Sequence, residues 1–395
     1  MEHEDTYDVV IIGGAMIGSS IAWHLVTNAD FDGRVLVIER DPTYEACSTT
    51  HTNSCIRAQY SIETNILISL YGIEFIRNFR ELMGHEDAPD LRIQDIGYLY
   101  LAGNDVVARR LKEACELQNR LGADTRILTP DQMAREYPFM NLDGVVLGSH
   151  GASNEGMFDG PTIFQWWRRR ARDLGATYLH DEVVAIERND RRVESVSLAS
   201  GRRIKAGCIV NAAGPRANVV AQMAGLSLPV EARRRFTYVF SAKNPPPSDM
   251  PLIIDPSGVH MRPEGNGFLC GCPPDIDTAM AFDDFSEEPG VWENKLWPGI
   301  AARIPAFEDV RVTTSWVGHY AFNTFDQNAL LGPMEEVENL YFANGFSGHG
   351  LQQSPAVGRG ISELIAYGTW KSLDLEPLSV RRLADNRPLR EANII

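Results

Sequence analysis

The chain has 395 residues, with 37 Lys plus Arg against 53 Asp plus Glu, which gives a formal net charge of −16. This acidic balance argues against a non-specific nucleic-acid binder, because such affinity comes mostly from cationic side chains on phosphates. Only five of the cationic residues are lysines, and the other 32 are arginines. Since Arg grips carboxylates and phosphates with a two-pronged fork, the composition favours the binding of small anions.

Length and composition indicate a globular protein of two domains or one two-lobed unit, with 44% hydrophobic and 23% charged residues. No stretch reaches about 18 uninterrupted apolar residues, so we expect no membrane-spanning helix. The acidic amino terminus runs directly into a predicted strand, so we expect no signal peptide and predict a cytoplasmic protein. The six cysteines are too sparse for a disulfide scaffold. Burial in a strand explains Cys270 and Cys272 better than a metal site does, so no metal is expected.

The strongest local signal lies in the first forty residues. Segment 7–12 (YDVVII) predicts a buried parallel strand, 13–18 (GGAMIG) a glycine turn, 19–27 a helix and 35–38 a second buried strand. This order is typical of a dinucleotide-binding unit, in which the amino terminus of the helix offers unpaired N–H groups to a pyrophosphate.

Single residues of this unit have separate physical roles. Gly13 would permit the tight turn, and Gly18 would let the helix pack closely on the strand. Glu39 lies 21 residues beyond Gly18, where it would accept hydrogen bonds from ribose hydroxyls. Ala15 replaces the usual middle glycine, so the motif is imperfect. The alternative is a turn of any βαβ unit, but the complete context from strand to acid favours a dinucleotide.

Two further clusters of small residues follow predicted strands. Segment 208–215 (CIVNAAGP) indicates a buried strand that runs into a small-residue turn. Segment 340–343 indicates another strand, followed by the glycine-rich loop 344–350 (NGFSGHG) and a helix over 354–367. This loop would place a second helix amino terminus beside an electron-rich group. The intervening elements are a helix over about 161–174, capped by Asp159, and strands over 182–187 and 193–199.

Together these motifs resemble the D-amino-acid oxidase superfamily of FAD enzymes. The resemblance rests on GGAMIG with Glu39, the loop 48–61 (STTHTNSCIRAQYS), 211–215 (NAAGP) and 344–365 (NGFSGHGLQQSPAVGRGISELI). It extends from about residue 7 to 367. Within the superfamily the chain is most similar to the sarcosine oxidase, glycine oxidase and dimethylglycine dehydrogenase branch, and to mitochondrial FAD-dependent oxidoreductase-domain proteins.

The resemblance implies an α/β fold with two domains. An FAD-binding Rossmann-like domain of the glutathione-reductase type would comprise 1–90, 150–222 and 326–370. A substrate domain on a mixed β-sheet would comprise 91–149 and 223–325. Its expected strands are 91–102, 235–241, 258–262 and 268–272. Residues 371–395 would form a solvated or partner-contacting extension.

The resemblance also implies that FAD is bound tightly and without a covalent link. An attachment through His51 stays open, because Ser48-Thr49-Thr50-His51 has the spacing of dimethylglycine dehydrogenase. The implied cofactor-binding residues are Gly13, Ala15, Met16, Ile17, Gly18, Glu39, Arg40, Ser48, Thr49, His51, Val184, Ala213, Gly214, Gly345, Gly348, His349, Gly350, Leu351 and Gln352.

The implied chemistry is oxidation of an amine beside a carboxylate, with hydride transfer to flavin N5 and hydrolysis of the resulting imine. Arg57 aligns with a substrate-binding arginine and would grip the carboxylate; the alternative is a salt bridge that holds the flavin loop. Sarcosine oxidase and glycine oxidase each have a second cationic side chain for the substrate carboxylate, a lysine and an arginine. In this chain Gln352 and Tyr320 occupy the two matching positions. Substrate contacts would be redistributed over Tyr238, Arg262, His319 and Tyr320.

The sequence therefore predicts an FAD-dependent oxidoreductase acting on a small secondary or N-substituted amino acid, such as sarcosine, iminodiacetate or an opine-like compound. The many arginines raise the hypothesis of a dicarboxylic substrate. The alternatives are a D-amino-acid or glycine oxidase or dehydrogenase, an NAD-dependent dehydrogenase, and a flavin-bound assembly protein without turnover. No lysine lies between Lys243 and Lys295, where sarcosine oxidase has its oxygen-activating lysine. The acceptor is thus oxygen or an electron carrier, and the oligomeric state is open.

Overall fold

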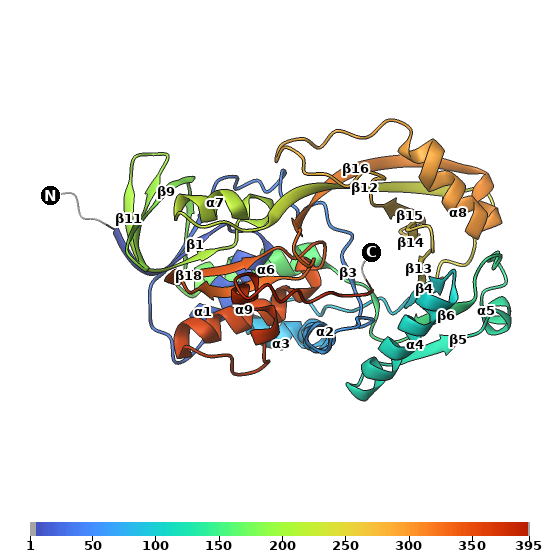
Figure 1. Ribbon diagram of the computed structural model, residues 1–395, viewed down its shortest axis with the longest axis horizontal. Coiled ribbons are helices and arrows are strands. Elements are labelled where there is room, and N and C mark those ends of the chain that lie inside the picture. Colours follow the sequence, from blue (N-terminus) through green and yellow to red (C-terminus); the bar gives the residue numbers. More distant parts are fainter. Residues whose placement is uncertain (1–4, 394–395) are drawn as a thin grey trace.

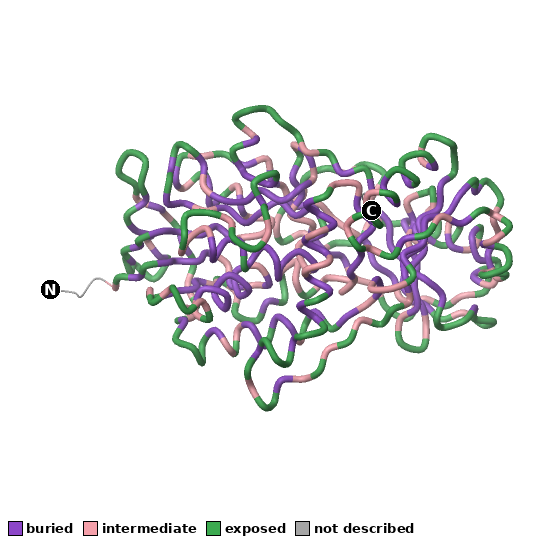
Figure 2. Tube along the Cα trace, turned by 90° about the horizontal axis from the view of Figure 1, so that it is seen from below, coloured by how far each residue is buried: buried purple, intermediate pink, exposed green. Residues whose placement is uncertain are grey.

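The computed structural model describes residues 5–393, which form two eight-stranded sheets and one two-stranded ribbon. Figure 1 shows the sheets at opposite ends of the long axis, with the long strands β12 and β16 reaching from one lobe towards the other. Buried stretches fill the interior of both lobes, while most loops at the rim are exposed (Figure 2). The α/β class and the two-lobed organisation are confirmed.

The first sheet contains the dinucleotide-binding unit. Its order is β17-β18-β11-β1-β2-β8, with β9 and β10 attached to β11. The strands are β1 (Asp5–Ile12), β2 (Val35–Glu39), β8 (Thr177–His180), β9 (Val183–Asn189), β10 (Arg192–Leu198), β11 (Arg203–Asn211), β17 (Leu330–Met334) and β18 (Val337–Asn344). Because β1 pairs in parallel with both β2 and β11, the carboxyl ends of these strands share one edge, where ligands bind in such sheets.

Both faces of β1 are buried, which explains its continuous apolar sequence. Val9 and Ile11 pack against helices on one face, and Val10 and Ile12 pack into a second core on the other. The helices of the first core are α1 (Met16–Thr27), α2 (Glu63–Arg77), α3 (Phe79–Met83), α6 (Gly160–Asp173) and α9 (Gly350–Tyr367). Helix α7 (Ala217–Met223) and the β9–β10 hairpin cover the second core.

The second sheet is mixed, as predicted. Its order is β16-β12-β15-β14-β13-β4-β6-β5, and only the β13–β4 pair is parallel. The strands are β4 (Tyr98–Ala102), β5 (Thr125–Leu128), β6 (Leu147–Gly151), β12 (Val230–Ala242), β13 (Leu252–Ile254), β14 (His260–Glu264), β15 (Gly267–Cys272) and β16 (Val310–Asn323). Helices α5 (Pro130–Glu136) and α8 (Trp297–Arg303) cover one face, and α4 (Asp105–Arg120) covers part of the other. The two-stranded ribbon is β3 (Cys55–Ile56) with β7 (Gly156–Met157).

Several predicted element boundaries were wrong. The strand expected over 91–102 covers only Tyr98–Ala102, and α1 begins at Met16 instead of residue 19. Helix α9 begins at Gly350, one turn before the predicted start at Ser354. Pro355 has no N–H for the carbonyl of Leu351, but the hydroxyl of Ser354 donates to that oxygen at 2.6 Å. The helix therefore continues through the proline.

Residues 371–393, predicted as a solvated or partner-contacting extension, are solvated only in part. Leu375, Leu378 and Val380 are buried in the cores of the first lobe. The Arg382 guanidinium forms two hydrogen bonds with the buried Asp326 carboxylate, of 2.7 and 2.9 Å. The predicted domain boundary at residue 150 needs a small correction as well, since β6 continues to Gly151 in the second sheet.

Candidate functional site

A cavity of about 530 Å³ extends between the two sheets, a size typical of cofactor and small-molecule sites. One part of its wall comes from the glycine turn after β1, from the residues that follow β2 and from the turn after β11. The other part comes from β12, β14 and β16 of the second sheet, and we call this part the substrate end. The carboxyl edge of the first sheet thus faces the side chains of the second.

The glycine turn leaves room for a ligand at the amino terminus of α1. Gly13 has φ +99°, and a Cβ there would lie 2.5 Å from the carbonyl oxygen of Ala212. A Cβ on Gly18 would overlap the carbonyl oxygen of Gly13, so helix and turn could not stay in contact. Ala15 has φ −73° at the start of α1 and needs no glycine. The N-cap residue Ala15 offers no side-chain cap, and the Met16 N–H donates to Thr49 Oγ1 at 3.3 Å; Met16 and Ile17 line the cavity, so the positive end of α1 faces the place of a phosphate.

Glu39 is held in position by the backbone around it. Its two carboxylate oxygens accept hydrogen bonds from the N–H groups of Gly14 and Asp41, both at 2.8 Å. Burial raises the pKa of Glu39 above its ordinary value, although these bonds oppose the shift. A carboxylate fixed in this way beside the glycine turn can accept hydrogen bonds from the hydroxyls of a ribose.

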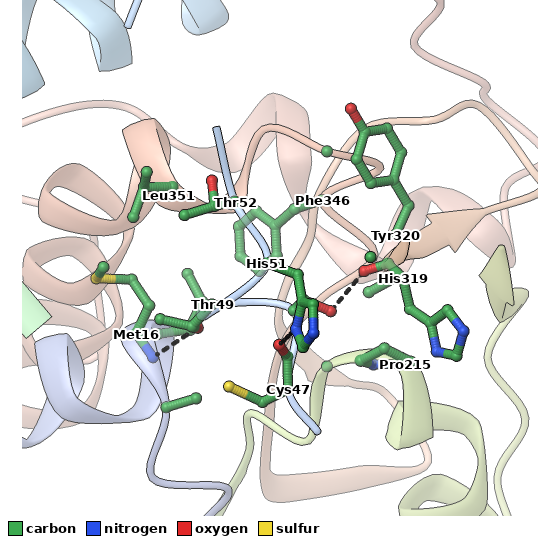
Figure 3. A pocket seen from close by; sticks show the side chains of 18 of the residues that line it. Met16, Cys47, Thr49, His51, Thr52, Pro215, His319, Tyr320, Phe346 and Leu351 are labelled. Carbon is green, nitrogen blue, oxygen red and sulfur yellow. Dashed lines mark hydrogen bonds between the residues drawn. The ribbon is translucent and has the colours of Figure 1, made fainter. Parts of the chain in front are cut away.

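Loop 47–55 forms another wall of the cavity. Thr49 Oγ1 accepts a hydrogen bond from Met16 N at 3.3 Å, and His51 Nδ1 contacts the carbonyl oxygen of Cys47 at 3.0 Å (Figure 3). Ser48 donates to the carbonyl oxygen of His319 at 2.6 Å, which ties this loop to β16. The Phe285 ring stacks on both His51 and His319, with centroid distances of 5.2 and 4.2 Å.

The NGFSGHG loop brings the amino terminus of α9 to the cavity. Gly348 has φ +96°, and a Cβ there would overlap the Tyr320 ring. Gly350, Leu351 and Gln352 line the cavity, and no side chain caps the helix. The partial positive charge of the helix terminus therefore faces the cavity, as predicted for this loop.

Arg262 and His260 project from β14 at the substrate end. The Arg262 side chain is only 4% exposed and donates to the carbonyl oxygen of Asn53 at 3.0 Å; it also pairs with Glu264. Burial, and then the charge of Arg262, lower the pKa of His260 to about 4, so this imidazole is neutral at pH 7. Gly271 on β15 makes room for it, since a Cβ there would lie 2.7 Å from Cε1 of His260.

Most predicted cofactor residues line the cavity: Gly13, Ala15, Met16, Ile17, Glu39, Arg40, Ser48, Thr49, His51, Ala213, Gly214, Gly348, His349, Gly350, Leu351 and Gln352. Gly18 acts indirectly, through its contact with Gly13. Two predictions need correction. Val184 is 51% exposed, and its neighbour Val183 lines the cavity instead. Gly345 has φ +70° and supports the turn from outside the cavity wall.

Among the predicted substrate contacts, Arg262, His319 and Tyr320 line the cavity, whereas Tyr238 and Arg57 do not. Tyr238 packs in the core beneath α8 and donates to Glu287 at 3.3 Å. The His319 ring is occupied, because its Nε2 contacts the carbonyl oxygen of Asp284 at 2.7 Å. Arg57 is 2% exposed and lies behind the cavity wall. The loop sequence gave its position but not the direction of its side chain.

The sequence did not indicate several residues that line the cavity at or beside the substrate end: Cys55, Tyr98, Arg235, Thr237 and His260. One signal could have found His260: it lies two positions before Arg262 on a predicted strand, so both side chains point to the same face. Arg235 is one of three successive arginines, 233–235, and a run of this kind does not show which side chain faces a cavity. The structure pairs Arg235 with Asp277 through two hydrogen bonds of 2.9 Å.

No group of three or more His, Cys, Asp or Glu residues that could hold a metal ion occurs within residues 5–393. Within the same range, none of the helices has the length and apolar character needed to span a lipid bilayer.

A glycine turn, a fixed acid, two helix amino termini and a cavity closed by a second sheet define a dinucleotide-dependent oxidoreductase of the two-domain flavoprotein class.

Comparison with known proteins identifies the family. The family model described as "FAD dependent oxidoreductase" (DAO) matches residues 8–364, and the chain belongs to this family. Its cofactor is therefore FAD, which fits the donor set of the cavity: the glycine turn, the amino terminus of α1 and the carboxylate of Glu39.

Three relatives illustrate the range of the family. "FAD-dependent oxidoreductase domain-containing protein 1" of Xenopus laevis is 37% identical, over 98% of this chain and 85% of its own. The mitochondrial sarcosine dehydrogenase of Mus musculus is 24% identical, over 95% of this chain but 41% of its own. The crystal structure of L-proline dehydrogenase from P. horikoshii has a TM-score of 0.84 and 25% identity, and covers 98% of this chain and 100% of the other.

Proposed function

We propose that the protein oxidises the C–N bond of a small secondary or N-substituted amino acid and that Arg262 binds the carboxylate of this substrate. The observation that carries the proposal is a nearly buried guanidinium in the cavity wall, beside the neutral imidazole of His260. A carboxylate in such a place gains strong charge-assisted hydrogen bonds. Two of the relatives support the substrate class, since sarcosine and L-proline are both secondary amino acids.

Bound FAD would supply a hydride acceptor for the carbon beside the substrate nitrogen, so that loss of this hydride and of the amine proton would give an imine, which water would hydrolyse. The residues of the chain position the substrate for this step. Arg262 would fix the carboxylate, and the uncharged His260 would not repel the cationic amine as it approaches. Tyr98, Leu252 and Ile254 form an apolar wall that limits access of water.

The second arginine of the substrate end favours a monocarboxylic substrate. Both Nη atoms of Arg235 bond to the Asp277 carboxylate, whereas Arg262 pairs with Glu264 through Nη1 alone, so Arg235 is the less available of the two for a substrate carboxylate. We therefore place sarcosine-like and proline-like compounds ahead of iminodiacetate. The cavity lining contains no lysine within residues 5–393, which supports an electron carrier over oxygen as the acceptor.

An anaerobic reduction panel tests this proposal. The purified FAD-bound protein is mixed with sarcosine, L-proline, glycine, a D-amino acid and iminodiacetate, and loss of the visible flavin absorbance is followed. We expect the secondary monocarboxylic compounds to reduce FAD fastest, and readmitted air to reoxidise it slowly. If dithionite reduces the flavin but no amine does, the proposal is wrong.

Arg262 has its own test in this assay. We expect Arg262→Met to raise KM roughly 10- to 100-fold, as for loss of a charged hydrogen bond of about 1.5–3 kcal/mol. Arg170→Met is the matched control, because Arg170 also donates to a backbone carbonyl, that of Met83, but lies outside the cavity wall. An unchanged KM in Arg262→Met would assign the carboxylate to another group.

A further inference from the structure

We propose that Arg57 is a positioning residue, which holds a buried positive charge behind the cavity wall and acts on bound FAD through His349. We further propose that the C-terminal segment, residues 389–393, keeps Arg57 in this place. The inference depends on FAD binding and not on the identity of the substrate, so either proposal can fail without the other.

The contacts of Arg57 place it one residue away from the cavity. Its Nη2 lies 3.2 Å from Nε2 of His349, and its backbone N–H donates to Oε1 of Gln352 at 3.0 Å. Both partners line the cavity. Gln352 in turn donates to the hydroxyl of Tyr60, whose ring lies 3.9 Å from the Arg57 guanidinium carbon. One arginine thus orients two residues of the cavity wall.

The charge of Arg57 has no direct counter-ion among residues 5–393. Its other hydrogen bonds go to the carbonyl oxygens of Gln59 at 2.7 Å and Asn393 at 2.8 Å. The nearest carboxylates are bonded to other groups: Glu155 accepts from Ala58 and Gln59, and Glu391 accepts from Ser61 and Asn65. A buried charge without a counter-ion is costly unless it serves an interaction elsewhere. The negative charge that FAD gains on two-electron reduction supplies such an interaction.

His349 lies between the Arg57 guanidinium and the cavity and is itself uncharged. A guanidinium can only donate hydrogen bonds, so Nε2 of His349 must accept and the imidazole must be neutral. Burial, and then the charge of Arg57, lower the pKa of His349 to about 3, in agreement with this assignment. The positive potential at this part of the cavity therefore comes from Arg57 and from the amino terminus of α9.

The C-terminal segment provides a second contact to Nη2 of Arg57, the nitrogen that also bonds to His349. The carbonyl oxygen of Asn393 accepts from the Nη2 that also bonds His349. Glu391 anchors the segment, because its carboxylate accepts from the Ser61 hydroxyl at 2.6 Å and from Asn393 N at 3.0 Å. With this nitrogen engaged twice, Arg57 is held away from any ligand in the cavity.

The test is the midpoint potential of bound FAD in substrate-free protein, measured with redox dyes. We expect Arg57→Gln to lower the potential by about 30 mV or more, which equals a tenfold loss of stability of the two-electron-reduced form. Arg57→Lys, which keeps the charge, should stay close to wild type. Glu391→Ala, which changes no residue of the cavity wall, should shift the potential in the same direction but less.

Arg170→Gln is the matched control, and its potential should equal that of the wild type. An unchanged potential in an FAD-loaded Arg57→Gln protein would overturn the proposal, and a raised KM at unchanged potential would make Arg57 the carboxylate ligand after all. If Arg57→Gln does not retain FAD, Glu391→Ala decides: a lowered potential supports the role of the segment, and an unchanged one refutes it.

Discussion

At the scale of single residues, the turn at the cofactor site depends on two glycines. A Cβ on Gly13 or Gly18 would meet a carbonyl oxygen, so backbone geometry leaves only one residue type at these positions. Arg57 and Tyr238 were misplaced because sequence gives the order of residues in a loop or strand but not the partner of each side chain. The carbonyl that holds Arg57 belongs to Asn393, 336 residues further along the chain.

We predict that Gly18→Ala weakens FAD binding at least tenfold. The added methyl group would overlap the carbonyl oxygen of Gly13, so α1 would move away from the turn that cradles the pyrophosphate. Equilibrium titration of FAD onto apoprotein checks this. Ala15→Gly, three residues earlier, restores the usual motif without a clash and should bind FAD at least as well as the wild type. Equal affinities for all three proteins would show that the turn does not hold the cofactor.

At the scale of elements, the presence of strands and helices was predicted better than the residues at which they begin and end. Apolar runs bounded by glycine located β1, β2 and β11 because both faces of a parallel sheet are covered. The start of α9 was missed because a proline normally marks the first turn of a helix. Here Ser354 compensates for Pro355, a side-chain contact that the residue pattern does not reveal.

This compensation predicts a non-additive pair of substitutions. Ser354→Ala should destabilise the protein by about 0.5–1.5 kcal/mol, because the partly buried carbonyl of Leu351 loses its donor. In a Pro355→Ala background the backbone N–H of residue 355 can bond that carbonyl, so Ser354→Ala should cost much less. Urea unfolding of the four proteins measures the difference. Equal costs in both backgrounds would mean that the hydroxyl does not stabilise α9.

At the scale of the whole molecule, the two-domain flavoprotein architecture was predictable from motifs spread over most of the chain, and the family match over residues 8–364 confirms it. The burial of part of residues 371–393 was not predictable, because the polar and arginine-rich sequence of this segment is typical of a surface. The Arg382–Asp326 pair shows the reason: each charge is buried with the other, and neither segment reveals its partner.

Buried neutral histidines predict how global stability depends on pH. Burial is the main cause that lowers the pKa of His24 and His150 to about 4 and that of His349 to about 3. In the unfolded chain these side chains are solvated and have the ordinary pKa of 6.5. Below pH 6.5 the unfolded chain binds protons that the folded protein excludes, so the free energy of unfolding falls as pH falls. Each histidine should contribute about 2 kcal/mol of this loss between pH 6.5 and 5.

Urea unfolding at pH 7.5 and 5 measures this loss, and His24→Gln should reduce the difference between the two values. His24 lies in α1 outside the cavity wall, so the substitution changes no group of the site. A variant with the same pH dependence as the wild type would assign the acid sensitivity to other groups.

The wide spacing of the pieces that meet at β1 has a consequence for biosynthesis. Strand β1 ends at Ile12 and pairs with β11, which begins only at Arg203; β11 pairs with β18, and one contact of Arg57 is made by Asn393. During synthesis from the amino end, the glycine turn emerges long before its neighbours exist. The cofactor can thus be captured in its final surroundings only by a chain that has been made almost to residue 393. Until β11 has been made, the strongly apolar β1 has only β2 as a partner, and the nascent protein must keep its open edge from aggregating.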